Sequence, residues 1–509
     1  MSKRNLILCF FILLKFVLQY FAIDSGYELH RDEYLHLDLA KHLAWGYSSV
    51  PPVTAWISYL ILHLGNSVFW VKFFPALFGA LTVVVVWKTI EELKGDLFAL
   101  ILGSVSVIFS ILLRINTLYQ PNSLEYLIWT ILFFTIIKFI NSENNKWLWL
   151  ASLSFAIGFL NKYNISFLLI GLLPAILLTS HRKIFLNRHF YLSMLASLIL
   201  VTPNLIWQYN NDFPVLHHLE TLSKTQLVNV NRADFLKEQI LFFFGSGFVL
   251  ILAFISFFRY LPFKKYVIFL WSYVFIIAIY FYLKAKGYYA IGLYPVLLAF
   301  GSVYLENLLR NGWLRYVRPI AILIPIVVFL PQIQFVLPVL TPDKIVQKTE
   351  RFERVGLLRW EDGINHSLPQ DFADMLGWHE LANIVDSAFE SIQDKEHTLI
   401  HCDNYGQAGA INFYSNQKFT QAVSMNADYI NWYPLDEMEI KNVILVKDAS
   451  DPDINREKEK SLFKTITFKG EIQNKYAREC GTRVYLLKGA KQSINDILQE
   501  EILKRKDRH

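Results

Sequence analysis

The chain has 509 residues, of which 54% are hydrophobic, 16% aromatic and only 18% charged. This composition is too apolar for a soluble enzyme and is typical of a protein that crosses a membrane many times. The net charge of +6 is small for this length and does not indicate a nucleic-acid partner. The cysteines Cys9, Cys402 and Cys480 exclude a disulfide-rich scaffold and lack metal-ligand spacing, and whether Cys402 and Cys480 pair stays open.

An apolar segment at residues 5–23 follows Lys3 and Arg4, and we interpret it as an uncleaved first membrane helix rather than a signal peptide. Its length is near the ~20 residues needed to span a bilayer. No small-residue cleavage site precedes Asp24. With the apolar segments at 69–87, 97–113, 124–140, 147–160, 165–179, 190–207, 240–258, 266–283, 288–305 and 320–336, the chain is predicted to cross the membrane about eleven times.

Lysine and arginine are unevenly divided between alternate loops, and this imbalance predicts how the chain is oriented in the membrane. Cytoplasmic loops carry the excess of these residues, so the N-terminus belongs in the cytoplasm. The loop at 24–67 and the connection at 209–237 then face outward, and so does the tail after the last crossing. We predict a multi-pass protein of a plasma membrane, with a bacterial host favoured and the host compartment otherwise open.

The character of the chain changes at Pro338 and Pro342, where a polar tail of about 170 residues begins, enough for a small domain. A transmembrane domain at 1–337 and an extracytoplasmic α/β domain at 338–509 are therefore predicted, the latter to recognise acceptors or to form a lid. Its predicted elements are strands at 398–401 and 443–446, helices at 374–391 and 407–413, and a solvated helix or frayed tail at 492–509.

Acidic residues gather in the first outward loop. Asp32 and Glu33 precede apolar and aromatic residues at helical spacing as far as Tyr47, so they are expected to open an amphipathic helix lying on the membrane. The helix dipole favours ionised carboxylates near such an N-terminus. They would be available as a general base or cation anchor, although an inert solvated loop explains any single carboxylate about as well.

Basic residues stand at outward helix ends, where the orientation rule does not require them. Arg114, Lys162, Lys284 and Lys286 are candidate ligands of a lipid phosphate, together with Arg31 of the first loop. Snorkelling to the headgroup layer is the alternative for any one of them. Nearby aromatic residues are candidate sugar or lipid contacts, or members of the interfacial aromatic belt: Tyr34, Trp45, Tyr163, Tyr288 and Tyr289.

A carboxylate beside cations on an outward surface favours single-displacement transfer of a group from a lipid phosphate. The acid would activate an acceptor hydroxyl while the cations stabilise the departing phosphate. Such a leaving group needs no protonation, unlike the sugar alkoxide in glycoside hydrolysis, so one working carboxylate is enough.

Five short motifs stand out in the predicted outward loops and the tail: Arg31-Asp32-Glu33-Tyr34, Gln120-Pro121-Asn122-Ser123, Asn161-Lys162-Tyr163, Lys286-Gly287-Tyr288-Tyr289 and Asn404-Tyr405-Gly406-Gln407. They resemble the GT-C type glycosyltransferases that use polyprenyl-phosphate sugars, in the branch of dolichyl-phosphate-mannose protein mannosyltransferases and the aminoarabinose lipid A transferase. The resemblance implies a GT-C fold, Asp32 as the catalytic acid/base position with Glu33 as its acidic neighbour, and Lys162 and Lys286 at the lipid phosphate. The aminoarabinose branch has an acidic-basic pair where this chain has Val50-Pro51, so its acceptor and its metal site do not carry over.

The sequence therefore predicts an inverting, mannosyltransferase-like membrane glycosyltransferase that moves a hexose or pentose from an undecaprenyl or dolichyl phosphate. Its acceptor would be a protein, lipid A or an envelope glycan, and its surroundings are membrane lipids. A lipid-linked glycan flippase and a glycan polymerase or ligase are the alternatives. A transporter would carry ionisable residues in mid-membrane, where Lys15 is the main example here. No metal ligands are predicted, while a divalent metal and the oligomeric state stay open.

Overall fold

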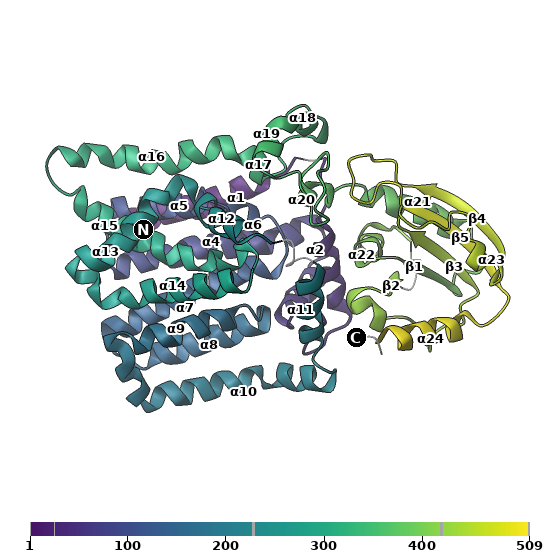
Figure 1. Cartoon of the computed structure of the whole chain (residues 1–509), viewed down its shortest axis with the longest axis horizontal. Helices are drawn as coiled ribbons and strands as arrows, with labels where there is room; N and C mark the ends of the chain where they lie inside the picture. Colours follow the sequence, from purple (N-terminus) through teal and green to yellow (C-terminus); the bar gives the residue numbers. More distant parts are fainter. Residues whose placement is uncertain (1, 25, 226–229, 418–420, 507–509) are drawn as a thin grey trace.

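The computed structural model describes residues 2–24, 26–225, 230–417 and 421–506, and it consists of a helical bundle with an α/β domain at one end (Figure 1). Ser25 of the first loop, residues 226–229 of the predicted 209–237 connection and residues 507–509 of the predicted terminal helix lie outside the described residues.

Helices cover all of the apolar segments that the sequence predicts to cross the membrane. They are α1 (Lys3–Phe21), α4 (Val68–Glu92), α5 (Leu97–Ile108), α7 (Pro121–Ser142), α8 (Lys146–Asn161), α9 (Ile165–Leu177), α10 (Arg188–Asn210), α12 (Arg232–Leu241), α13 (Gly247–Arg259), α14 (Val267–Tyr282), α15 (Tyr294–Leu308) and α16 (Arg318–Phe329). Shorter helices join them or lead toward the C-terminal domain: α6 (Leu112–Ile115), α11 (Pro214–Thr225), α17 (Ile333–Val336), α18 (Pro342–Val346), α19 (Thr349–Arg354) and α20 (Gln370–Ala373).

The multi-pass prediction is confirmed, although the number of crossings is not. Within the described residues, seven helical segments are long and apolar enough to cross a membrane, or nine if each of two bent helix pairs counts as one span. The remaining predicted segments correspond to α5 and α8, which have 12 and 16 residues. Both are shorter than the ~20 residues of a straight crossing. Eleven crossings therefore stay a prediction.

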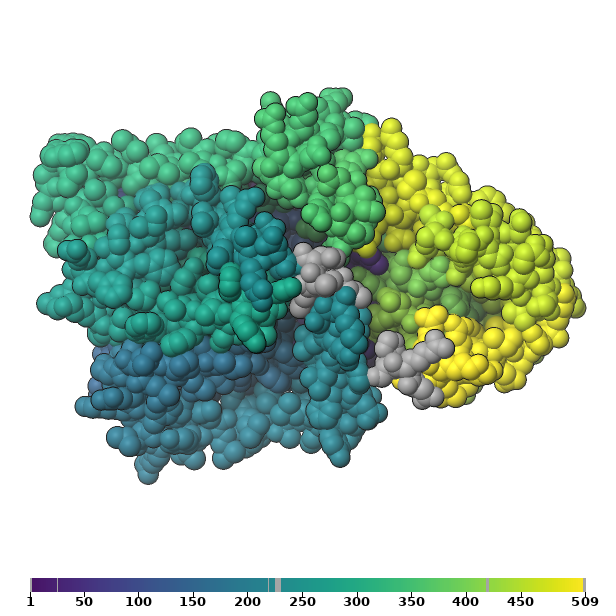
Figure 2. Space-filling view, in the orientation of Figure 1, coloured from purple at the N-terminus to yellow at the C-terminus, as the bar shows by residue number. Residues whose placement is uncertain are grey.

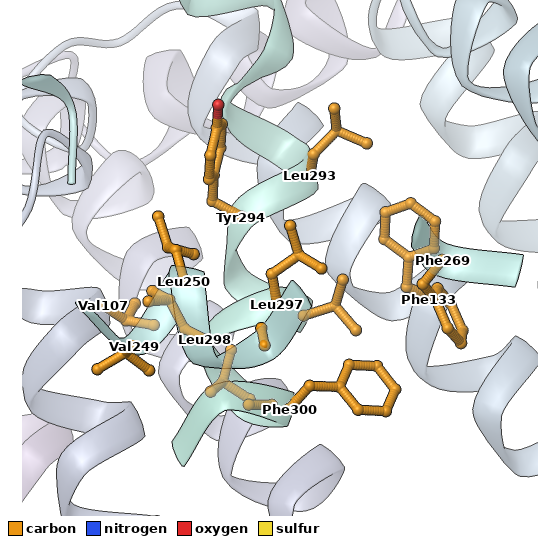
Figure 3. Close-up of a cluster of buried hydrophobic side chains, with 14 of the residues drawn as sticks. Val107, Phe133, Val249, Leu250, Phe269, Leu293, Tyr294, Leu297, Leu298 and Phe300 are labelled. Atoms are coloured by element: carbon orange, nitrogen blue, oxygen red, sulfur yellow. The ribbon is translucent and has the colours of Figure 1, made fainter. Parts of the chain in front are cut away.

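The centre of the bundle is α15, whose residues 294–305 are all buried. A helix that is apolar on every side must be surrounded by protein, and Figure 3 shows Leu297, Leu298 and Phe300 of this helix among side chains of its neighbours. At Gly301 a Cβ atom would stand 2.0 Å from the carbonyl oxygen of Val249. The glycine thus permits the close approach of α15 to α13, as small residues commonly do between membrane helices.

The C-terminal domain is built on a five-stranded sheet in the order β2-β1-β3-β5-β4. β1 pairs in parallel with β2 and β3, whereas β5 is antiparallel to β3 and β4. The strands are β1 (Thr398–Cys402), β2 (Val423–Ser424), β3 (Asn442–Lys447), β4 (Phe463–Glu471) and β5 (Arg483–Ala490), and the helices are α21 (Trp378–Glu390), α22 (Tyr405–Tyr414), α23 (Glu457–Lys460) and α24 (Ile494–Lys506).

Alternate strand residues serve two separate hydrophobic cores, because successive side chains point to opposite faces of a sheet. Ile400 and Ile444 pack with α21 and α22, whereas Leu399 and Leu445 pack with α24. The predicted strands and the predicted helix at 407–413 are confirmed. A helix also forms in the predicted segment 492–509, but the prediction that it is solvated or a frayed tail is wrong, because Ile494, Leu498 and Ile502 of α24 are buried in the second core. The helix predicted from 374 begins only at Trp378, since Gly377 before it has a φ of +87°. The free cysteine Cys402 lies buried in β1, and Cys480 is also unpaired.

The first loop folds into two short helices, α2 (Arg31–Asp38) and α3 (Val53–His63). The prediction of one helix lying on the membrane as far as Tyr47 is wrong in its length and in its surroundings. α2 ends at Asp38, and a 3-10 turn reaches only Lys41. Beyond it, the Tyr47 hydroxyl accepts a hydrogen bond from the Ala44 N–H and donates one to the His42 carbonyl, a geometry that replaces helical bonds.

α2 is buried between the bundle and the C-terminal domain, where it packs against α22. At Gly409 of α22, a Cβ atom would stand 2.6 Å from Cβ of Tyr34, so the two helices are in close contact. One hydrophobic cluster joins first-loop residues Tyr34, Leu35 and Leu37 to the core of the C-terminal domain. The two domains predicted on either side of the 337/338 boundary therefore share a hydrophobic core.

The N-terminus and the C-terminal domain lie at opposite ends of α1. The N–H of Asp24, just after this helix, donates a 2.8 Å hydrogen bond to the carbonyl of Pro338 at the start of the tail. Lys3 is at the other end of the helix, remote from the α/β domain (Figure 1). This arrangement agrees with the prediction that the N-terminus and the C-terminal domain lie on opposite sides of the membrane. Which of the two sides is cytoplasmic stays a prediction.

Candidate active site

The first turn of α2 is fixed by a cap of the capping-box type: the side chain of the residue before the helix accepts from a backbone N–H of the first turn, and the third helical residue accepts from the backbone N–H of the residue before the helix. The His30 ring accepts a hydrogen bond from the Asp32 N–H at 3.2 Å, and the Glu33 carboxylate accepts one from the His30 N–H at 2.7 Å. The two adjacent acids consequently have different surroundings. Glu33 has no exposed surface, whereas 37% of the Asp32 side chain is exposed.

Glu33 ties the first loop to the bundle. Each of its carboxylate oxygens lies 2.8 Å from Nζ of Lys72 on α4, and one accepts a 2.7 Å hydrogen bond from the Tyr119 N–H. The Lys72 ammonium also donates to the Thr117 carbonyl at 3.0 Å. A buried charge has to be paired in this way. The sequence predicts a catalytic role for Glu33, but the structure gives this side chain structural partners and no access to a substrate.

Asp32 is held by donors from both parts of the protein. The Tyr405 hydroxyl of α22 donates to its Oδ1 at 2.7 Å, and Nε2 of Gln120, at the start of α7, donates to its Oδ2 at 3.2 Å. Burial alone would raise the pKa of the Asp32 carboxyl, but the nearby His30 and Arg31 and the Tyr405 hydrogen bond together lower that pKa below its usual value. Asp32 is thus a carboxylate at neutral pH.

A chain of hydrogen bonds connects Asp32 to Lys162, which follows α8. Oε1 of Gln120 accepts from Nδ2 of Asn122 at 3.1 Å, and Oδ1 of Asn122 accepts from Nζ of Lys162 at 2.6 Å. The sequence alone brings Gln120 and Asn122 forward only as parts of a motif. In the structure both side chains lie between the predicted base and a predicted phosphate ligand and join the two by hydrogen bonds.

Lys162 stands in a polar niche with aromatic walls. Its ammonium lies 3.1 Å from Oε2 of the buried Glu125 and 5.3 and 4.8 Å from the ring centres of Tyr288 and Tyr289. The exposed fraction of the Lys162 side chain is 21%. Predicted residues Lys162, Tyr288 and Tyr289 are therefore brought together, and Lys162 is linked to Asp32.

An apolar cavity of about 530 Å³ opens between α7, α8, α9 and α10. Its walls include Leu132, Phe159 and Leu198, and its lining is almost entirely hydrophobic. The ring of Phe159 lies 5.0 Å from that of Tyr163, the residue next to Lys162, so the cavity reaches the neighbourhood of the niche. The Tyr163 hydroxyl bonds with Asn204 and Gln208 of α10 at 3.1 and 3.0 Å.

The other predicted cations lie against the segment that leads into the C-terminal domain. Arg114 is buried, 3.6 Å from Asp371 and with its guanidinium 5.7 Å from the ring centre of Phe372. Lys286 pairs with Glu361 at 3.0 Å, and Lys284 is half-buried nearby in the chain. These contacts do not link the three cations to Asp32, and their role as phosphate ligands stays a prediction.

Tyr34 and Trp45, two of the aromatic residues predicted to contact the sugar or the lipid, do not lie beside Lys162. Tyr34 is completely buried, donates a 3.0 Å hydrogen bond to the Leu29 carbonyl and packs on Trp378 of α21. It therefore belongs to the core between the domains and cannot meet a sugar in this arrangement. Trp45 is 47% exposed and stands edge to face with Trp56 of α3, which suits an interfacial position.

Between the bundle and the C-terminal domain the surface is hollowed, and purple atoms from the N-terminal part of the chain are visible in the hollow (Figure 2). On the C-terminal domain, a polar pocket of about 340 Å³ includes Arg31, Asn404, Asp448 and Glu479 in its lining. Burial and the neighbouring Glu479 raise the pKa of Asp448 to about 6. Within the described residues, no group of three or more His, Cys, Asp or Glu side chains is placed to hold a metal ion.

The chain is similar to membrane glycosyltransferases, in sequence over one stretch and in fold over nearly its whole length. Residues 49–207 match the family model "dolichyl-phosphate-mannose-protein mannosyltransferase". The fold is that of ArnT from Cupriavidus metallidurans: the crystal structure bound to undecaprenyl phosphate aligns with a TM-score of 0.65 and 13% identity over 95% of this chain and 98% of ArnT. The apo ArnT structure aligns with a TM-score of 0.62 and 11% identity over the same shares of the two chains.

These findings confirm the resemblance inferred from the sequence. The chain is similar to the protein mannosyltransferases over residues 49–207 and to ArnT in its fold. No curated protein sequence matches it.

Proposed function

We propose that this protein transfers a sugar from a polyprenyl phosphate to an acceptor hydroxyl at the outer face of the membrane, with inversion, and that Asp32 is the general base. The observation that carries the proposal is the Asp32 carboxylate, exposed on one side and linked through Gln120 and Asn122 to the Lys162 ammonium. A base and a phosphate ligand are the two groups that this transfer needs.

The reaction is a single displacement. Asp32 takes the proton of the acceptor hydroxyl as its oxygen forms a bond to the anomeric carbon. The bond from that carbon to the phosphate oxygen breaks, and its electron pair leaves with the phosphate, whose charge Lys162 stabilises. Because a phosphate departs without being protonated, no second acid is required.

The donor's lipid tail fits the apolar cavity between α7 and α10. The cavity volume of about 530 Å³ and its hydrophobic lining suit an isoprenoid chain, and its wall at Phe159 adjoins Tyr163 beside the niche. The undecaprenyl phosphate bound to ArnT, which shares the fold, supports a lipid donor of this kind. Neither the sugar nor the acceptor follows from these residues.

The test is turnover by purified protein in nanodiscs, with a panel of undecaprenyl-phosphate hexoses and pentoses and with lipid A, envelope glycans and Ser/Thr peptides as acceptors. Asp32→Asn should lower kcat by about 10²–10⁴-fold, the usual contribution of a general base, while undecaprenyl phosphate still binds. The control is Asp24→Asn, because Asp24 is another first-loop acid, and its side chain accepts a hydrogen bond from the Gly26 N–H.

Full turnover by Asp32→Asn would remove this residue from the mechanism. Transport of the lipid-linked sugar across vesicles without any glycosylated product would favour the flippase alternative. Products longer than one added sugar would favour a polymerase or ligase.

A further inference from the structure

We propose that Tyr405 is a positioning residue for Asp32, so that the C-terminal domain supplies part of the active site rather than acting only as a lid or acceptor platform. The inference rests on the proposed role of Asp32 as base and adds a residue from the other side of the protein. Its basis is the 2.7 Å hydrogen bond from the Tyr405 hydroxyl to Oδ1 of Asp32, across 373 positions of sequence.

The Tyr405 ring is clamped in place by α2. The guanidinium of Arg31 lies over it, 4.6 Å from the ring centre, an arrangement that attracts the cation to the face of the ring. The next residue, Gly406, allows close packing, because a Cβ atom there would stand 3.3 Å from Cβ of Arg31. Arg31 is thus a support for Tyr405 in this structure, and it also borders the polar pocket.

The helix that carries Tyr405 is anchored from behind. Asn404 caps α22 by accepting a 3.1 Å hydrogen bond from the Gln407 N–H. The Gln407 side chain donates to Asp448 at 2.5 Å and to Glu479 at 2.8 Å. A fully satisfied network of buried polar groups restricts a helix to one position. The start of α22 is therefore rigid where the hydroxyl meets Asp32.

Tyr405 and Gln120 each bind one oxygen of the same carboxylate. With a donor on each oxygen, the plane of the carboxylate is fixed, and one lone pair per oxygen remains to accept a proton from the acceptor. Burial and the negative charge of Asp32 raise the pKa of Tyr405 well above its ordinary value, so the hydroxyl stays protonated and remains a donor. It stabilises the ionised form of Asp32 over the protonated form.

Several other charged or titratable groups face Asp32 and would contribute to its titration. They are His30, Arg31 and His36 from the first loop, Asp374 from the segment after α20, and Tyr288 from the turn before α15. A substitution at Tyr405 leaves all of them in place. A change in the pH profile of that variant alone would then report the lost hydroxyl.

The experiment compares Tyr405→Phe with Tyr414→Phe in the full chain. Tyr414 is on the same helix and also meets the first loop, but its hydroxyl bonds with the Leu29 N–H and the Tyr34 hydroxyl instead of Asp32. Both variants remove one hydroxyl from the same contact between domains. Because the pKa of Asp32 lies below the usual value of about 3.9, the readout is kcat/KM from about pH 2.5 to pH 8 with an undecaprenyl-phosphate sugar accepted by the wild type, together with Tm.

Loss of the Tyr405 hydrogen bond should raise the pKa of Asp32, so the acid limb of the profile should move to higher pH by about one unit, the size expected for one hydrogen bond to a charged group. Tyr414→Phe should keep the wild-type profile even if its Tm falls. Identical profiles for the two variants would overturn the proposal. So would a loss of activity in Tyr405→Phe that is uniform across the pH range.

A second substitution keeps the proposal testable if Tyr405→Phe does not fold. Replacing Tyr405 with 3-fluorotyrosine keeps the hydroxyl and makes it a stronger donor, so the acid limb should move to lower pH. An unmoved limb would count against a role in positioning Asp32. The proposed function is tested separately, since an active Asp32→Asn variant refutes the base itself, whereas an inactive one with an unmoved Tyr405 profile refutes only this inference.

Discussion

Lys162 is the predicted cation whose position best suits a phosphate beside Asp32. Four predicted cations at outward helix ends are equivalent in the sequence, yet Arg114 and Lys286 lie against Asp371 and Glu361. Lys162 also pairs with a carboxylate, that of Glu125, and its side chain is about as exposed as that of Lys286. Its distinction is the chain of hydrogen bonds through Gln120 and Asn122 that joins it to Asp32. A partly exposed ammonium whose partner is already in place can bind a further anion without a large rearrangement.

Substitution of Lys162 by Met should weaken the binding of undecaprenyl phosphate about tenfold or more, because a hydrogen bond to a charged group is lost. The variant should be made together with Glu125→Gln, so that no unpaired buried charge is left. Affinity is measured by titration of the purified protein with undecaprenyl phosphate. Lys286→Met tests the other lysine predicted at the phosphate, and a loss of affinity there equal to that of the Lys162 variant would place the phosphate nearer Glu361.

At the scale of elements, α2 carries the proposed base because it is anchored on two sides. Glu33 attaches it to α4 through Lys72, and Gly409 permits its contact with α22. Asp32 and Glu33 have different surroundings although they are adjacent, because successive side chains project about 100° apart around an α-helix. One carboxylate is therefore directed into the bundle while the other reaches the exposed side.

Removing Lys72 should destabilise the protein much more than neutralising Asp32. Lys72→Met leaves the Glu33 carboxylate buried without its cation, at a cost of about 3–5 kcal/mol. The double variant Lys72→Met with Glu33→Gln should recover much of this loss. Tm in detergent, followed by size-exclusion chromatography after heating, compares these variants with Asp32→Asn. A wild-type Tm for Lys72→Met would show that the ion pair does not hold the loop.

At the scale of the whole molecule, the bundle and the C-terminal domain are not independent units. The hydrophobic cluster that contains Tyr34, Leu35 and Leu37 also contains Trp378 and Ile400 of the α/β domain. The Tyr27 hydroxyl donates a 2.9 Å hydrogen bond to the Leu340 carbonyl. The first loop thus requires the tail for part of its own core.

Truncation after Leu337 should consequently yield a protein that aggregates. It should not yield a folded protein that still binds the donor and has only lost the ability to use an acceptor. It would expose first-loop residues that are buried in the intact chain, and exposed apolar surface favours association. The control is truncation after Lys491, which removes α24 and opens only the core around Leu399 and Leu445. Monodispersity and undecaprenyl phosphate binding are measured for both. A stable, donor-binding 1–337 fragment would refute the shared core.

The sequence predicts the helical bundle, the C-terminal α/β domain and the acidic first loop because these depend on patterns within about 20 residues. The length of an apolar segment identifies the membrane helices, and short continuous apolar runs identify buried strands such as β1 and β3. The chain's likeness to GT-C glycosyltransferases could also be recognised at this level, since short polar motifs survive in the loops. The strands β2, β4 and β5 lack so clear a pattern, and β4 is largely exposed.

Only the tertiary structure decided which residues share the site. It separated Asp32 from Glu33, joined Asp32 to Lys162 through Gln120 and Asn122, and added Tyr405 from the far end of the chain. The physical reason is that a local pattern reports which face of an element is apolar, but the partner of a polar side chain depends on how distant elements pack. The sequence by itself determined that a carboxylate and cations occur at the predicted outward loops, and packing selected the ones that meet.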